Sequence, residues 1–156
     1  MMLNDDVFGN LEYDMSWDGK TKVTFLGKEV EVTLRVRGDE SGKFLDTQKQ
    51  AYTNFMNQQE TLMLDVANGI FDYYNSVRDE YREIFGDDAD IYAPIINSVD
   101  ELAPLVKFTH LIVENFDEAD RIILLLFKSK WDTDMGVGVM LRNEQIDTLG
   151  TQDDVL

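Results

Sequence analysis

The sequence of 156 residues contains no cysteine, only two prolines and a single histidine. The absence of cysteine excludes disulfides, zinc–thiolate sites and thiol catalysis. Because His110 is the one histidine, sites that need several histidines are excluded as well. Any enzyme activity would therefore depend on carboxylates, hydroxyls or lysines, and we predict no catalytic residue, metal ligand or cofactor.

Long apolar segments are also missing. The longest apolar run, Ile122 to Phe127, is six residues long, whereas a membrane-spanning helix needs about 20. The first ten residues contain neither a basic region nor an apolar run, so they do not resemble a signal peptide. These features predict a cytoplasmic protein without a membrane segment.

Positive charge is scarce. The chain has 14 basic and 31 acidic residues, and its formal net charge is −17. Such a chain should repel nucleic acid and anionic membranes. Residues 46–104, with 3 basic and 12 acidic residues, are the most acidic part. Two explanations stay open: a solvated helix face, or a surface that attracts a basic protein partner.

Residues 11–37 are predicted to form a three-stranded antiparallel meander. From Val30 to Val36, apolar residues alternate with polar ones, which is typical of a half-buried strand. Gly27-Lys28 suits a two-residue hairpin loop, which would pair Phe25 with Val30. The hydrophobic pattern favours a three-residue turn at Trp17-Asp18-Gly19, with Gly19 in the left-handed conformation.

Two helices are predicted over about residues 47–85. The first is capped by Asp46 or Thr47 and ends near Met56. The second, Thr61 to Phe85, has apolar residues at spacings of three or four, which predicts one buried face. These residues are Leu62, Val66, Ile70, Tyr74, Val77, Tyr81 and Ile84. Gly69 indicates close approach to a strand, and Gly86 suits the C-terminal cap.

The second half of the chain returns to strands. Ser98 to Glu101 has a capping-box pattern for a short helix at about 99–103, which Pro104 ends. An acidic turn is predicted at 115–120 and a polar tail at 151–156. The predicted strands are Leu105–Glu114, Arg121–Ser129, Gly136–Leu141 and Gln145–Leu149.

The order of these elements predicts one α+β domain over residues 1–156. In it, an antiparallel sheet from an N-terminal three-stranded meander (about 11–37) and a C-terminal meander (about 105–149) packs on the long central helix. The sequence leaves open whether the two meanders form one sheet or two.

The acidic clusters are weak candidates for cation sites. Asp132-x-Asp134 and Asp87-Asp88-x-Asp90 offer the oxygen ligands that calcium and magnesium prefer. Neither has the spacing of an EF-hand loop, so we interpret both as turn residues. His110 lies in a strand pattern beside Phe108 and Ile112, and we interpret it as a packed, hydrogen-bonded residue.

The segment from Trp131 to Val139 is the best candidate for a binding site. It has a large aromatic residue beside acidic groups, directly after an apolar strand. One interpretation is a turn that packs Trp131 over the sheet edge. The other is a binding lip in which Trp131 is partly exposed and binds a partner together with Asp132, Asp134 and Met135.

The sequence also resembles a bacterial domain-of-unknown-function family of small, acidic, cysteine-poor α+β proteins. The similar segments are Phe8 to Tyr13, Gly27-Lys28, Phe71 to Tyr74, and the Trp131 to Val139 block with Gly150. That block is similar to W-D-x-E-H-G-x-G-V in the family. Here Asp134-Met135 replaces the Glu-His pair, so a role that needs this histidine is not expected. The resemblance implies the fold and brings no established activity.

Two functions agree with these observations. The first is a non-enzymatic acidic interaction protein that binds a basic protein partner, for which immunity proteins of bacterial toxin systems are an analogy. The alternative is a small carboxylate- or metal-dependent hydrolase that uses Asp132, Asp134 and nearby carboxylates. A large rise in melting temperature with calcium, magnesium or manganese would favour the hydrolase. We expect the interaction protein, with neither nucleic acid nor membrane as its partner.

Overall fold

The computed structural model describes residues 1–116 and 118–156. Asp117, which belongs to the predicted acidic turn, lies outside the described residues. The strands are β1 Met2–Asp5, β2 Gly9–Asp14, β3 Ser16–Phe25, β4 Lys28–Val36, β5 Val106–Val113, β6 Ile122–Ser129, β7 Val137–Arg142 and β8 Gln145–Gly150. The helices are α1 Asp46–Asn57, α2 Gln59–Phe85, α3 Ala89–Tyr92 and α4 Gln152–Val155, with short 3-10 helices at Gly86–Asp88 and Val99–Leu102.

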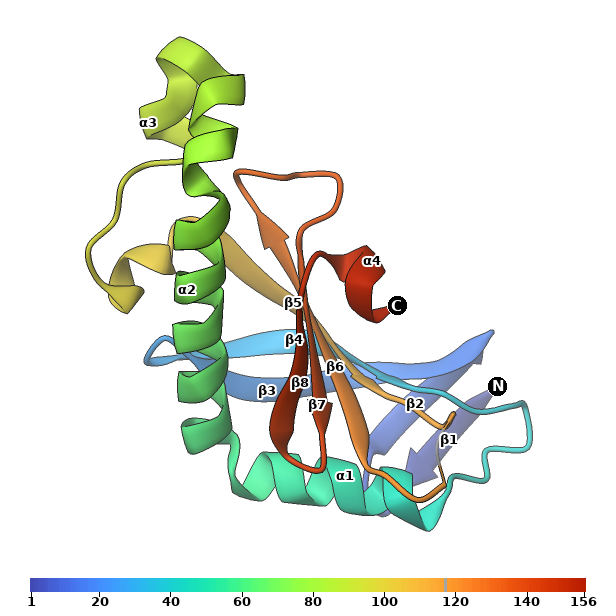
Figure 1. The fold of residues 1–156 in the computed structure, drawn as a ribbon. Coiled ribbons are helices and arrows are strands. Elements are labelled where there is room, and N and C mark those ends of the chain that lie inside the picture. The colour runs from blue at the N-terminus through green and yellow to red at the C-terminus, as the bar shows by residue number, and fades with distance from the viewer. Residues whose placement is uncertain (117) are drawn as a thin grey trace.

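Over the described residues, the strands form one eight-stranded sheet in the order β1 to β8 (Figure 1). Neighbouring strands are antiparallel except β4 and β5, which are parallel. A parallel pair needs a long connection, and α1 and α2 lie between these two strands in the chain. The predicted α+β class is confirmed, and the sheet is mostly antiparallel. The parallel β4–β5 pair departs from the predicted antiparallel sheet, and β1 is a strand that the predicted three-stranded meander lacks. Both halves of the chain contribute to this sheet.

Helices α1 and α2 form an L on one face of the sheet (Figure 1). Helix α1 contacts β5 and β6, whereas α2 contacts β3 and β8. The predicted apolar face of α2 is buried at Leu62, Val66, Ile70 and Tyr74. The C-terminal end of α2 extends past the sheet, so Ile84 is 70% exposed and its predicted burial is wrong.

The two glycines of the α2 region have the predicted roles. A Cβ at Gly69 would lie 2.9 Å from Cδ1 of Leu149, so this glycine lets α2 approach β8 closely. Gly86 is the C-terminal cap of α2, and its φ of 58° is left-handed. A glycine adopts this conformation without the steric cost that other residues have.

The predicted turn at Trp17-Asp18-Gly19 is wrong, because these residues lie inside β3. The chain turns instead at Met15, whose φ of 66° is left-handed. This turn buries Trp17, whose Nε1 donates a hydrogen bond to the Asp39 carbonyl oxygen at 2.8 Å. Burial of the tryptophan outweighs the roughly 1–2 kcal/mol that a left-handed non-glycine residue costs.

The next hairpin loop is displaced by one residue from its predicted place. The loop is Leu26-Gly27, and Lys28 is the first residue of β4. Both loop residues have positive φ, 51° and 76°, as a type I′ turn requires. Phe25 consequently pairs with Lys28, so its predicted pairing with Val30 is wrong.

The predicted left-handed conformation of Gly19 is wrong. We expect this glycine to contribute to stability because it lets β2 and β3 approach each other closely. A Cβ at Gly19 would lie 2.5 Å from the Asn10 carbonyl oxygen. Gly19→Val is therefore expected to lower the free energy of unfolding by about 1–3 kcal/mol in urea denaturation, because β2 must shift. Lys20→Val, at the exposed neighbouring position, controls for valine in this strand. Equal midpoints for both variants would contradict the steric argument.

The predicted polar tail at 151–156 is wrong in part, because Gln152–Val155 forms α4. Val155 is buried against an apolar cluster on the face of the sheet opposite α2 (Figure 1). Gly138 leaves room for it, since a Cβ there would lie 2.5 Å from Cγ2 of Val155. The buried members of this cluster are Ile112, Ile122, Leu124, Leu126 and Val155.

Candidate functional site

The predicted binding lip is the connection between β6 and β7. Trp131 is only 2% exposed, and its ring lies 4.6 Å from the ring of Tyr74 in α2, measured between centroids. The expected partial exposure of Trp131 is therefore wrong. The ring belongs to the main core, because the chain turns back at the end of β6 and places it under α2.

Asp132 holds this connection against α2. Its side chain accepts hydrogen bonds from the Tyr81 hydroxyl at 3.0 Å and from the Met135 amide at 3.0 Å. Burial, and then the bond to Asp132, raises the pKa of Tyr81 to about 12, so the phenol stays protonated and donates. Asp134 is exposed and Met135 is partly buried. Binding of a partner by Asp132, Asp134 and Met135 stays a prediction.

His110 has the predicted hydrogen-bonded environment but a different face. A bulge between Phe108 and His110 interrupts the alternation of β5, so His110 pairs with Leu126 while Phe108 pairs with Phe127. Its Nδ1 lies 2.9 Å from the Thr109 hydroxyl oxygen. Burial, and then the charge of Arg35, lowers the pKa of His110, which favours the neutral ring.

Among the residues that the structure describes, no group of three or more histidine, aspartate or glutamate side chains is arranged to hold a metal ion. In the same residues, no helix has both the length and the apolar character needed to cross a membrane. The hydrolase alternative stays a prediction.

A projecting helical end combines exposed apolar and acidic residues, and we call it the α2–α3 tip, residues 79–95. Figure 1 shows this end of α2, with α3 beside it, standing clear of the sheet. Its exposed apolar residues are Ile84 at 70%, Ile91 at 58%, Tyr92 at 41% and Ile95 at 61%. Its exposed carboxylates belong to Asp79, Glu80, Glu83, Asp87, Asp88 and Asp90. The periodicity of α2 could not reveal this surface, because it assigned Ile84 to the buried face.

The α2–α3 tip is fixed by contacts within itself. Arg82, its one basic residue, donates to Asp90 at 2.9 Å and to the Ala93 carbonyl oxygen at 2.9 Å. The rings of Phe85 and Tyr92 lie 5.1 Å apart, and Ala93 is fully buried. These contacts connect α2 to the segment after α3, so the exposed residues belong to a folded surface.

The chain matches a known protein family over most of its length. Residues 7–156 match the model of a domain of unknown function, DUF6985. The chain belongs to the DUF6985 family. No curated protein and no solved structure matches it significantly. The DUF6985 match spans both the connection around Trp131 and the α2–α3 tip, so both surfaces are part of the family domain.

Proposed function

We propose that this DUF6985 protein is a non-enzymatic interaction protein that binds a basic protein partner through the α2–α3 tip. The observation that carries the proposal is the gathering of large exposed apolar side chains among exposed carboxylates on a projecting element. Single exposed apolar residues are common, but several together are typical of interaction surfaces.

The charge and the apolar residues of the tip indicate which kind of partner surface it would bind. Six exposed carboxylates face a single arginine, Arg82, which is already paired with Asp90. A partner surface with lysines and arginines around an apolar centre is complementary to this arrangement. The net charge of −17 adds long-range attraction, which speeds association at low salt. The apolar contact contributes affinity that salt does not screen.

The test compares the wild-type protein with a tip variant in pull-downs from the native cell at low and high salt. Ile84→Ser/Ile91→Ser removes exposed apolar groups of the tip without touching the core. Leu64→Ser/Phe116→Ser is the matched control, since these side chains are 58% and 60% exposed and lie outside the tip. We expect wild type and control to retain the same basic protein, and the tip variant to bind it about tenfold more weakly.

The affinity of the purified partner for each of the three proteins is then measured. Polylysine is the control for binding by charge alone. Polylysine should bind all three proteins equally, because the substitutions leave the carboxylates in place. Equal affinity of the partner for wild type and tip variant would contradict the location of the site. Retention of no basic protein by the wild type would contradict the proposed function itself.

We propose that the family is bacterial and acidic, and that its members share the block from Trp131 to Val139, as the sequence resemblance implies. We also propose that the protein acts in the cytoplasm. Two features support this location. The chain contains no cysteine, so it has no need of an oxidising compartment, and its net charge of −17 disfavours binding to an anionic membrane.

A further inference from the structure

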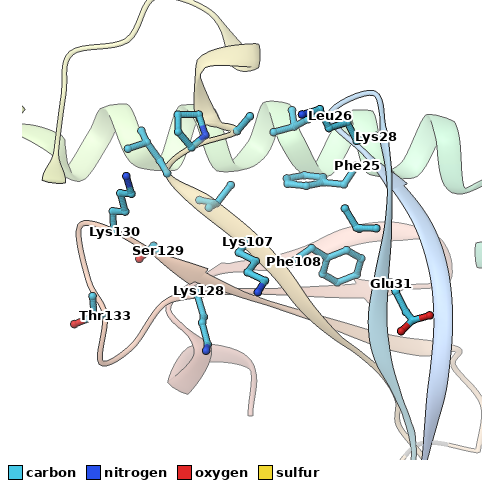
Figure 2. Close-up of a pocket in the computed structure, with 15 residues that line it drawn as sticks. Phe25, Leu26, Lys28, Glu31, Lys107, Phe108, Lys128, Ser129, Lys130 and Thr133 are labelled. Atoms are coloured by element: carbon cyan, nitrogen blue, oxygen red, sulfur yellow. The ribbon is translucent and has the colours of Figure 1, made fainter. Parts of the chain in front are cut away.

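A cavity of about 600 Å³ opens where β4 and β5 separate (Figure 2). These parallel strands are paired only from Thr33–Val36 to His110–Val113. Before that point the two strands diverge, as Figure 2 shows, and residues of both line the space between them. The 3-10 helix end at Ala103 and the Ser129–Thr133 connection complete the walls.

The inner surface of the cavity is apolar. Phe25 and Phe108 lie on it, and both rings contact Phe127 behind them, with centroid distances of 5.2 and 4.9 Å. The other apolar lining residues are Leu26, Val30, Ala103, Pro104, Leu105 and Val106. Sites for small molecules are typically apolar clefts of about 300–1,000 Å³ with a few polar groups that fix the ligand.

The rim of the cavity is basic in a strongly acidic protein. Lys28, Lys107, Lys128 and Lys130 line it, against one carboxylate, Glu31. Four of the eight lysines of the chain therefore line one cavity. In the described residues, each of the six arginines has a carboxylate partner, whereas no ion pair engages these four lysines.

The sheet register gives a second, independent sign of an anion site. Lys107 of β5 and Lys128 of β6 are directly opposite each other in the antiparallel ladder. Like charges that lie directly opposite each other in an antiparallel ladder are destabilising. A bound anion beside both ammonium groups would remove the repulsion.

We propose that this cavity binds a small amphiphilic anion, an apolar carboxylate of the fatty-acid type. Its chain would contact the aromatic inner surface, and its carboxylate would bind the lysines of the rim. The ligand must be small, because the net charge of −17 repels a large acidic partner or an anionic membrane. A small ion inside the rim is close to the lysines, while charges beyond about 8 Å are largely screened at physiological salt.

The site is independent of the proposed protein partner, since no residue of the α2–α3 tip lines it. The test is isothermal titration calorimetry with sodium decanoate. Decyltrimethylammonium has the same chain with the opposite charge, and acetate has the same carboxylate without the chain. We expect saturable binding of decanoate and at least tenfold weaker binding of both other probes.

Two variants locate the binding. Lys107→Gln/Lys128→Gln should weaken decanoate binding about tenfold, whereas Lys43→Gln/Lys49→Gln, with the same charge change away from the cavity, should leave it unchanged. Ala103→Trp, at an exposed wall position, should block the cavity and abolish binding. Without ligand, the Lys107/Lys128 variant should melt about 2 °C higher than the Lys43/Lys49 control, because the repulsion is gone.

Several outcomes would overturn the proposal. These are no saturable binding of decanoate to the wild type, unchanged binding by both cavity variants, or equal affinity for decyltrimethylammonium. Stronger binding to vesicles of anionic lipid than to monomeric decanoate would show a membrane surface as the ligand instead. Higher ligand-free stability together with weaker binding in the Lys107/Lys128 variant would support it, because a structural role for these lysines predicts lower stability.

Discussion

Replacing Ile70 with aspartate is expected to abolish the folded state. Ile70 is fully buried in α2, at the centre of the core between this helix and the sheet. A carboxylate there would lose its hydration, and the cavity left by the apolar side chain adds its own cost. The expected loss is about 5 kcal/mol or more, which is comparable to the whole stability of a typical domain. Circular dichroism and urea denaturation measure it.

Leu64→Asp is the matched control for the Ile70 substitution. Leu64 lies on the same helix and is 58% exposed, so an aspartate at this position adds the same charge outside the core. We expect Leu64→Asp to change stability by about 0.5 kcal/mol or less. If Ile70→Asp melted at the same temperature as Leu64→Asp, the packing of α2 on the sheet would be refuted.

The spacing of apolar residues was sufficient to predict a helix face wherever the same partner covers that face along its whole length. The face of α2 from Leu62 to Tyr74 repeats at helical spacing and rests on one continuous sheet. The same repeat continues to Ile84, but the sheet ends before it, and a sequence pattern does not show where its partner ends. The helix was therefore predicted correctly as far as Ile84, and the mistake was to expect the sheet to cover that residue.

Turns were predicted less well than strands, because a distant partner decides between competing loop positions. The turn at Met15 costs local strain, and its compensation is the burial of Trp17 against residues far along the chain, including Phe44. Likewise, α4 forms because Val155 finds an apolar cluster from β5 and β6. Its short polar sequence gives no sign of that contact.

The candidate sites show the same limit. The sequence singled out the segment from Trp131 to Val139 as a candidate binding site, and Thr133 of this segment, with the preceding Lys130, lines the cavity. It could not show that Trp131 turns inward. It also could not show that Lys28 and Lys107 line one cavity, because this depends on the parallel pairing of β4 with β5 across the intervening helices. The burial of Trp131 and the lining of the cavity both depend on contacts between segments far apart in the chain.

Trp131→Ala is expected to destabilise the protein by about 3–5 kcal/mol. The ring is 2% exposed and packs at 4.6 Å on Tyr74, so truncation leaves a large cavity between α2 and the sheet. It also loosens the connection that Asp132 fixes to Tyr81. Urea denaturation followed by the fluorescence of the remaining tryptophan, Trp17, measures the loss.

Trp131→Phe separates packing from a role in binding. Phenylalanine retains an aromatic ring against Tyr74, so we expect it to recover roughly half of the stability that alanine loses. A core role predicts that stability follows the volume of the side chain, while partner affinity measured on the folded fraction stays constant, because the α2–α3 tip lies on a different surface. The binding-lip interpretation predicts the opposite: nearly unchanged stability and an affinity loss of about 2 kcal/mol or more in Trp131→Ala. Measuring both quantities on the same two variants decides between them, and the burial of the ring favours the core role.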